Sequence, residues 1–178
     1  MIIWINGAFG AGKTSVTKLL LEEVADACVF DPEDMGYVIQ KTFPEARALD
    51  YQDLALWRQL VTQFIVQAQQ RFPCTLIIPM TLVVPAYLNE IFSEVTKGEP
   101  NFRHFFLETS KEELQRRITN QVIIESDAAK DEEVRQWRLA QIGRCVQAKS
   151  TMPENTIFLD TNTNSPAELV AMIMKECF

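Results

Sequence analysis

The sequence reads Gly7-Ala8-Phe9-Gly10-Ala11-Gly12-Lys13-Thr14 near its start, and the rest of the chain can be arranged around these eight residues. The pattern is a glycine, four free positions and then Gly-Lys-Ser/Thr, which is typical of a phosphate-binding P-loop. Three of the six glycines of the chain lie within these eight residues, at positions 7, 10 and 12. A Cβ atom at such positions would block the turn or keep backbone N–H groups from the phosphate oxygens. The stretch therefore predicts a nucleotide-binding loop.

The residues on both sides of this loop support the prediction. The six residues before it form an apolar run, as expected of a parallel strand that is buried on both faces. After it, Val16, Leu19, Leu20 and Val24 recur at helical spacing. A strand, a glycine-rich loop and a helix in this order are the context that a P-loop requires. The alternative is a glycine-rich turn that binds no ligand.

We expect the loop to bind ATP together with Mg²⁺. Lys13 would place a positive charge at the β- and γ-phosphates, and the Thr14 hydroxyl would be a ligand of Mg²⁺. The first turn of the following helix adds the positive end of its dipole to the same anion. Lys13 is also a predicted catalytic residue. The residues predicted here to bind the nucleotide are Gly7, Ala8, Phe9, Gly10, Ala11, Gly12, Lys13, Thr14 and Ser15.

Composition limits the class of protein. A chain of 178 residues with 47% hydrophobic residues suits one domain, residues 1–178, with a substantial core. The net charge of −7 argues against general binding of nucleic acids or anionic membranes. The uncharged stretch 72–89 contains three prolines, so we expect a buried strand and loop there and no membrane span. Both a monomer and a homodimer remain open.

The cysteines and the first residues predict a cytoplasmic location. The four cysteines form no C-x-x-C pair and the chain has one histidine, so a zinc site is not expected. The first predicted strand begins at Met1, which leaves no room for a signal peptide. We therefore expect a cytoplasmic protein with reduced thiols. His104 lies inside a predicted strand, where a structural role is the expected one.

Strand-like and helix-like segments alternate along the chain. Four further short apolar runs are predicted to be strands, at 28–31, 75–79, 102–108 and 157–160. Helical patterns separate them, and Ser110 and Ser165 each begin a capping box. The alternation predicts an α/β fold of three layers, with a doubly wound, five-stranded parallel sheet of the P-loop NTPase type.

Two segments are longer than the fold requires. Residues 31–71 join the second and third strands and exceed a simple crossover, so we predict a substrate-binding insert there. Residues 119–134 are polar and acidic, and we expect a mobile flap between two helices, the second starting near Val134. The flap and the start of that helix, about 119–138, form the predicted lid.

Carboxylates follow the second predicted strand, in Asp31-Pro32-Glu33-Asp34. Because the carboxyl ends of parallel strands share one rim with the P-loop, these side chains are expected near the phosphates. The aspartate that many P-loop proteins carry after a neighbouring strand is absent, since Pro79-Met80-Thr81 stands there. Asp31 is the nearest replacement, as a general base or as a ligand of a Mg²⁺-bound water. The alternative is a solvated acidic turn.

Arginines bracket the predicted flap. Phosphoryl transfer needs positive charge around the γ-phosphate and exclusion of water, and a closing lid can supply both. We predict Arg117 and Arg138 as catalytic residues, and Arg116 and Asn162 as further contacts of the nucleotide. The alternative for each arginine is a solvated helix surface. The residues predicted to bind the acceptor are Asp31, Met35, Trp57, Arg58, Thr81 and Arg144, of which the aromatic and apolar ones could equally be core.

Several stretches together resemble the tunicamycin-resistance protein family, a branch of the P-loop kinase-like proteins that includes nucleoside monophosphate, shikimate and antibiotic kinases. They are residues 1–10, Gly12-Lys13-Thr14, Phe30-Asp31-Pro32-Glu33, Leu56-Trp57-Arg58, Pro79-Met80-Thr81, Gln141-Ile142 and Arg144-Cys145-Val146. The resemblance implies a fold of the nucleoside monophosphate kinase-like type. It also implies that Pro79-Met80-Thr81 is a normal variant, and the flap here is longer than usual for that family.

Two functions from different classes fit these residues. The first is a kinase that transfers the γ-phosphate of ATP to a small molecule, such as a nucleoside-like antibiotic or a metabolite. The second is a nucleotide-dependent protein that sequesters an antibiotic such as tunicamycin without modifying it. A GTPase is not favoured, because the sequence has no Asn-Lys-x-Asp for guanine and no Asp-x-x-Gly after a strand.

Overall fold

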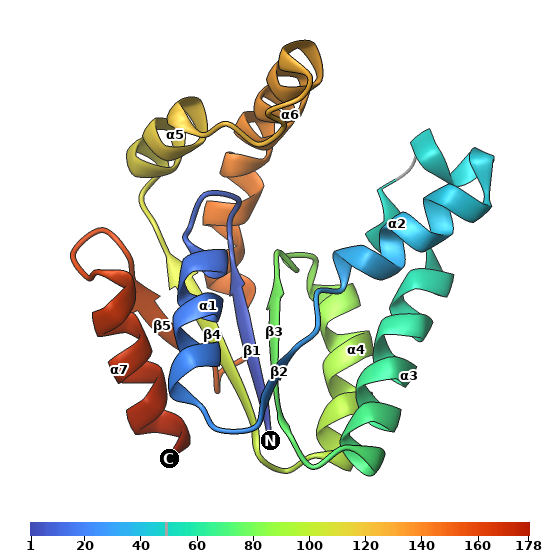
Figure 1. Cartoon of the computed structure of the whole chain (residues 1–178), viewed down its shortest axis with the longest axis vertical. Coiled ribbons are helices and arrows are strands. Elements are labelled where there is room, and N and C mark those ends of the chain that lie inside the picture. Colours follow the sequence, from blue (N-terminus) through green and yellow to red (C-terminus); the bar gives the residue numbers. More distant parts are fainter. Residues whose placement is uncertain (49) are drawn as a thin grey trace.

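The computed structural model describes every residue of the chain except Leu49 and the side chain of Ala48. Five parallel strands form one sheet in the order β2-β3-β1-β4-β5. The strands are β1 (Ile2–Gly7), β2 (Ala27–Val29), β3 (Thr75–Met80), β4 (Phe102–Glu108) and β5 (Ile157–Asp160). The P-loop strand β1 is therefore the central strand, flanked by β3 and β4 (Figure 1).

Helices cover both faces of this sheet. They are α1 (Lys13–Glu23), α2 (Glu33–Thr42), α3 (Ala55–Arg71), α4 (Pro85–Gly98), α5 (Lys111–Asn120), α6 (Ala128–Gln147) and α7 (Pro166–Cys177). Short 3-10 helices span Pro44–Ala48, Tyr51–Asp53 and Ala148–Thr151. Helices α1 and α7 lie against one face, and α3 and α4 against the other (Figure 1). The predicted three-layer α/β fold is confirmed.

Strand β1 shows why both faces are covered. Its side chains alternate between the two cores, with Ile3 and Ile5 in one and Ile2 and Trp4 in the other. All four are fully buried. The apolar run that predicted a strand buried on both faces is thus explained by alternation of side chains across a covered sheet.

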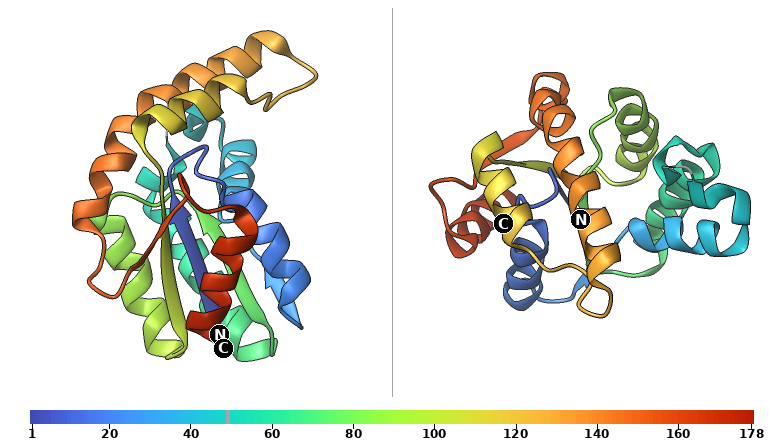
Figure 2. Two further views of the ribbon diagram at one scale, coloured as in Figure 1. Left: turned by 90° about the vertical axis from the view of Figure 1, so that its left-hand side faces the viewer. Right: turned by 90° about the horizontal axis from the view of Figure 1, so that it is seen from above.

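Helices α5 and α6 lie above the carboxyl ends of the strands and over the P-loop, while both chain termini lie near the opposite end (Figure 2). Helix α2 lies at the same upper end, beyond β3 (Figure 1). The cavity described below lies between these helices and the P-loop. None of the helices in the described part of the chain has the length and apolar character to cross a membrane.

Some boundaries differ from the predicted ones. Strand β2 ends at Val29, so Asp31 lies two residues beyond its end, although the Phe30 N–H still donates to the Ile77 carbonyl at 3.0 Å. Strand β3 continues through Pro79 to Met80. The expectation that Asp31 ends the strand was therefore wrong, and this carboxylate belongs to the turn that leads into α2.

The predicted flap is mostly helix, because α6 begins at Ala128 and not near Val134. The Asp127 side chain caps this helix by accepting from the Lys130 N–H at 3.0 Å. The acidic run also has a structural purpose. Asp131 is 4% exposed, and its carboxylate accepts from the N–H groups of Ile123 and Ile124 at 2.6 and 2.8 Å. An irregular segment is left only between Asn120 and Ala128.

The two predicted capping boxes differ in the structure. At α7 the box is complete, with Ser165 and Glu168 bonded reciprocally. At α5 the Ser110 hydroxyl accepts from the Glu113 N–H, but the Glu113 carboxylate does not accept from the Ser110 N–H. It binds two arginines, and the Ser110 N–H donates to the Asn162 side chain at 3.0 Å. Glu113 is thereby free to organise the arginines of α5.

Candidate active site

The P-loop carries three glycines in backbone conformations that other residues rarely adopt. Their φ angles are +148° at Gly7, +79° at Gly10 and +98° at Gly12. A Cβ atom on Gly10 would lie 3.0 Å from the Ile118 side chain, and one on Gly7 would lie 3.0 Å from Leu107. Backbone conformation and close packing therefore both require glycine. Gly12 immediately precedes the first residue of α1, so the loop opens directly onto the positive end of that helix.

The loop is held from below by a buried amide. Asn6, at the end of β1, is 0% exposed, and its Oδ1 accepts from the N–H groups of Gly7 at 2.8 Å and Leu82 at 3.0 Å. Its Nδ2 donates to the Leu82 carbonyl at 2.7 Å and lies 3.4 Å from His104 Nε2. The start of the P-loop and the end of β3 are thereby fixed to each other.

His104 belongs to this buried support. Its Nδ1 lies 2.9 Å from the Thr156 hydroxyl, and burial lowers the pKa of the imidazole to about 3. With Asn6 Nδ2 facing Nε2, the ring is neutral and carries its proton on Nδ1. The side chain is 1% exposed and does not reach the cavity, as its predicted structural role requires.

Lys13 is folded back into the loop. Its Nζ donates to the carbonyls of Gly7 at 3.0 Å and Ala8 at 2.9 Å, and to the Thr81 hydroxyl at 2.7 Å. Burial lowers its pKa to about 8, while the nearby Glu33 carboxylate acts in the opposite direction. The Thr81 hydroxyl in turn donates to the Gly7 carbonyl at 2.8 Å. The ammonium group is thus positioned at the mouth of the loop without any carboxylate bonded to it.

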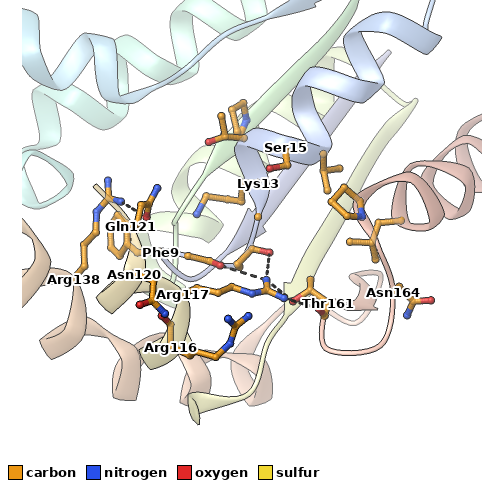
Figure 3. Close-up of a pocket in the computed structure, with 18 of the residues that line it drawn as sticks. Phe9, Lys13, Ser15, Arg116, Arg117, Asn120, Gln121, Arg138, Thr161 and Asn164 are labelled. Atoms are coloured by element: carbon orange, nitrogen blue, oxygen red, sulfur yellow. Dashed lines mark hydrogen bonds between the residues drawn. The ribbon is translucent and has the colours of Figure 1, made fainter. Parts of the chain in front are cut away.

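A cavity of about 590 Å³ opens above the loop (Figure 3). It lies under α5 and α6 and is bounded by the end of β5 on one side and by the start of α2 on the other. We call its two parts the phosphate half and the acceptor half. The phosphate half is lined by Gly10, Ala11, Gly12, Lys13, Thr14, Ser15, Val16, Arg116, Arg117, Asn120, Thr161, Asn164, Pro166 and Leu169, and the acceptor half by Phe9, Asp31, Glu33, Pro79, Gln121 and Arg138.

Arg117 closes the phosphate half beside β5. Its guanidinium donates to the Thr161 carbonyl at 2.8 Å (Figure 3), and also to the Glu113 carboxylate at 2.7 Å. Arg116 makes two bonds of 2.7 Å to the same carboxylate. The hydrogen bonds of Arg116, followed by those of Arg117, lower the pKa of Glu113 to about 2. One carboxylate therefore holds both predicted arginines above the loop.

Arg138 lies at the boundary between the two halves. Its guanidinium stands over the Phe9 ring, 5.3 Å from the ring centre, and donates to the Gln121 side chain at 3.4 Å (Figure 3). Trp137 packs edge-on against the same ring at 5.0 Å. The aromatic residue of the P-loop thus joins the loop to α6, the helix that carries Arg138.

Two carboxylates line the acceptor half. Asp31 is half-buried, and its Oδ1 accepts from the Glu33 N–H at 3.0 Å, which leaves its other oxygen free of this bond. Burial is the main cause that raises the pKa of Asp31. Burial and then repulsion from Asp31 raise the pKa of Glu33, whose carboxylate accepts from the Tyr37 hydroxyl at 3.3 Å. Sequence reasoning did not select Glu33, although its place two residues after Asp31 was the available signal.

Several residues predicted to bind the acceptor lie elsewhere. Trp57 is 0% exposed, and its indole N–H donates to the Pro32 carbonyl at 2.9 Å, so it is core. Met35 packs against the same core. Thr81 is 1% exposed, and its hydroxyl accepts a hydrogen bond from Lys13 below the cavity. Arg58 is bound by Glu90 at 2.6 Å, and Arg144 lies 3.7 Å from Asp50, both outside the cavity.

Three predicted nucleotide contacts do not line the main cavity. Asn162 caps α5 and lines a smaller neighbouring cavity of about 170 Å³, while Thr161 and Asn164 of the same loop line the main one. Gly7 and Ala8 lie beneath the cavity, where their carbonyls receive Lys13. Phe9 to Ser15, Asp31, Arg116, Arg117 and Arg138 are brought together around the cavity, as expected.

A family model described as an AAA domain matches residues 2–144. No curated protein sequence matches the chain. Solved structures of similar fold include the tunicamycin resistance protein of Deinococcus radiodurans, with a TM-score of 0.72 and 23% identity, covering 98% of this chain and 94% of that one. A sugar kinase from Janibacter sp. HTCC2649 has a TM-score of 0.66 and 16% identity, covering 98% and 92%.

A shikimate kinase from Bacteroides thetaiotaomicron also shares the fold. Its TM-score is 0.62 at 13% identity, covering 99% of this chain and 97% of that one. At these identities the likeness concerns the fold alone. The resemblance expected from the sequence, to the tunicamycin-resistance family among P-loop kinase-like proteins, is confirmed.

Proposed function

The chain belongs to this AAA domain family, and we propose that it is an ATP-dependent kinase that phosphorylates a small molecule. The observation that carries the proposal is the division of one cavity. A P-loop with its lysine forms one half, and two carboxylates that bond to no cation stand in the other. A nucleotide phosphate and an acceptor hydroxyl could therefore meet between them.

The phosphate half fits a nucleotide. Polyphosphates are bound by backbone N–H groups of a glycine-rich loop, by an ammonium group and by a helix N-terminus. This half offers all three, and Lys13 forms no ion pair with a described carboxylate. Lys13 would turn from the Gly7 and Ala8 carbonyls to the phosphates. The Thr14 hydroxyl would hold Mg²⁺, with Asp31 reaching it through water. When bound, ATP supplies the phosphoryl group and Mg²⁺ screens its charge.

The nucleotide base would lie toward β5. Arg117, Asn164 and Leu169 line that end of the cavity and offer a planar cation, a side-chain amide and an apolar surface. Asn162 of the same loop would act indirectly. It accepts a hydrogen bond at the start of α5 and so helps to position Arg116 and Arg117 on that helix. We propose Asn162 as a positioning residue and not as a direct contact.

Asp31 is the proposed general base. The bond from the Glu33 N–H to one of its oxygens fixes the carboxylate, and the free oxygen can accept a proton from an acceptor hydroxyl. Burial raises its pKa, which makes it a better proton acceptor than an exposed aspartate. Arg117 and Arg138, one on each helix above the loop, would stabilise the charge that develops on the transferred group.

Residues 119–138 are proposed to act as the lid and residues 31–71 as the acceptor-binding insert of a single domain. Lid arginines that move onto the phosphates would exclude water from the reaction. Amide hydrogen exchange in 119–138 should slow when a non-hydrolysable ATP analogue with Mg²⁺ is added. Unchanged exchange at saturating analogue would remove the lid from the proposal. The free thiols at Cys28, Cys74, Cys145 and Cys177 and a need for ATP both fit a cytoplasmic protein.

A second function is a protein that sequesters an antibiotic without modifying it. The similar fold of the Deinococcus radiodurans tunicamycin resistance protein supports a role toward an antibiotic, and the same cavity could hold one. The two functions differ in whether Asp31 has a proton to remove. A sequestering protein has no chemical step and therefore no need for a base beside the phosphates.

Incubation with ATP labelled in its γ-phosphate and pooled small molecules tests the proposal. We expect a labelled product that is absent with Asp31→Asn, and matched levels of product with Asp34→Asn, whose side chain is exposed and does not line the cavity. Retention of an antibiotic in its unmodified form, with label remaining in ATP, would favour sequestration.

A further inference from the structure

The two halves of the cavity differ in charge. The phosphate half contains the cations Lys13, Arg116 and Arg117, which suit a polyphosphate. The acceptor half contains Asp31 and Glu33, with Arg138 at the boundary between the halves. An acceptor that enters beside the carboxylates therefore meets negative charge first.

Both carboxylates lack a cationic partner among the described residues. Asp31 is bonded to the Glu33 N–H and Glu33 to the Tyr37 hydroxyl, and neither forms an ion pair with a described lysine or arginine. The two carboxylates stand two residues apart at the start of α2 and line the same half of the cavity. A positive charge placed there would reduce the repulsion between them.

The arginines that could bind an anionic acceptor are held elsewhere. Arg58 donates to Glu90 and to the Gln52 carbonyl, both at 2.6 Å, and stacks over the Tyr87 ring at 4.3 Å. Its side chain is only 12% exposed. Arg144 lies 3.7 Å from the Asp50 carboxylate. Neither lines the cavity, so Arg138 is the one cation among the described residues that lines the acceptor half.

Arg138 does not reverse this balance. Its guanidinium lies over the Phe9 ring of the P-loop and donates to Gln121, and it forms no ion pair with Asp31 or Glu33, so the two carboxylates outnumber it in this half. A nucleotide triphosphate would bring further negative charge to the same boundary and attract Arg138.

We infer that the acceptor is a hydroxyl compound that also carries a protonated amine, of the amino sugar, aminocyclitol or amino nucleoside class. The inference rests on the proposed function and adds the chemical class of its substrate. Asp31 faces the reacting hydroxyl, and Glu33 accepts hydrogen bonds from the ammonium group. Acceptors that carry a carboxylate or a phosphate are rejected by the same two side chains.

The test measures binding in matched sets that differ only in charge. The sets are hexoses, hexosamines, uronic acids and hexose phosphates, then cyclitols and aminocyclitols, and then nucleosides, amino nucleosides and nucleoside monophosphates. Calorimetry uses the full chain saturated with a non-hydrolysable ATP analogue and Mg²⁺. We expect at least one amine to bind on the order of tenfold more tightly than its neutral partner, because hydrogen bonds between charged groups are the stronger ones.

Glu33→Gln should reduce that preference to less than about threefold while the affinity for the ATP analogue stays the same. Asp34→Asn is the matched control, since it removes one exposed carboxylate from the same turn of α2 and should keep the preference. Tighter binding of the anionic members, equal binding of amine and neutral partners, or no binding by any amine would each overturn the inference.

The two proposals fail in different ways. Selective binding of an amine without phosphate transfer from ATP would contradict the kinase proposal and leave the acceptor class standing. Phosphorylation of a neutral or anionic compound, with no amine accepted, would support the kinase and overturn the acceptor class.

Discussion

The phosphate half and the acceptor half of one cavity are held by different kinds of structure. The phosphate half is built around a backbone turn of consecutive residues, fixed by positive φ angles at Gly10 and Gly12 and by the Asn6 amide below, and α5 and the segment after β5 add side chains to it. The acceptor half is assembled from segments far apart in sequence, the turn before α2 and the helix α6. The comparison indicates that local sequence determines the P-loop, whereas tertiary packing determines where the carboxylates of the acceptor half lie.

The largest expected effect lies in the acceptor half and separates it from the phosphate half. Asp31→Asn removes the proposed base but leaves the loop and Lys13 in place. Turnover should therefore fall by roughly 10²–10⁴, the usual contribution of a positioned acid–base group, while ATP affinity changes little. Steady-state kinetics and ATP titration on the same preparation check both parts. Full turnover in this variant would transfer the role of base to Glu33.

A second variant tests whether the acceptor half depends on packing. Trp57→Ala removes a fully buried side chain and its bond to the Pro32 carbonyl, next to Asp31. The free energy of unfolding should fall by about 3–5 kcal/mol, as for other large-to-small core changes. Denaturant unfolding measures it. Trp137→Ala is the control, because that side chain is 46% exposed, and a similar loss in both variants would contradict the assignment.

A third prediction concerns the buried support of the phosphate half. Burial lowers the pKa of His104 to about 3 from an unfolded value near 6.5, so the unfolded state binds the extra proton first. The contribution of the neutral His104 side chain to the free energy of unfolding is fully present above pH 6.5 and is lost as pH falls toward 3. The loss is about 2 kcal/mol at pH 5. His104→Gln should show a loss between pH 7.5 and pH 5 that is smaller by this amount. Identical pH profiles in urea unfolding would contradict a neutral, buried imidazole.

Much of the phosphate half could be predicted from sequence because its determinants are local. The glycines, the lysine and the apolar strand before them are consecutive, and each follows from backbone geometry or burial. The same holds for the strands, whose apolar runs reflect a sheet covered on both faces. Only their ends were misplaced, as at β2, where pairing stops at Val29 before the chain turns.

The acceptor half could not be predicted in the same way. An aromatic residue at helical spacing serves a core or a pocket equally well, and only the packed structure places Trp57 in the core. Arg58 and Arg144 are residues of the type that binds anions, but in the structure they pair with Glu90 and Asp50 and do not line the cavity. The acidic run before Val134 suggested a flap because the partners of Asp131, the N–H groups of Ile123 and Ile124, cannot be seen in composition.

The account depends most directly on the phosphate half being an ATP site. Calorimetric titration of ATP with Mg²⁺ into the wild-type chain and into Lys13→Ala tests this. We expect binding to the wild type and an affinity at least about tenfold weaker in the variant, a loss of about 1.4 kcal/mol, because the loop then lacks its ammonium group. Equal affinity in the two proteins, or no binding to the wild type, would contradict the account.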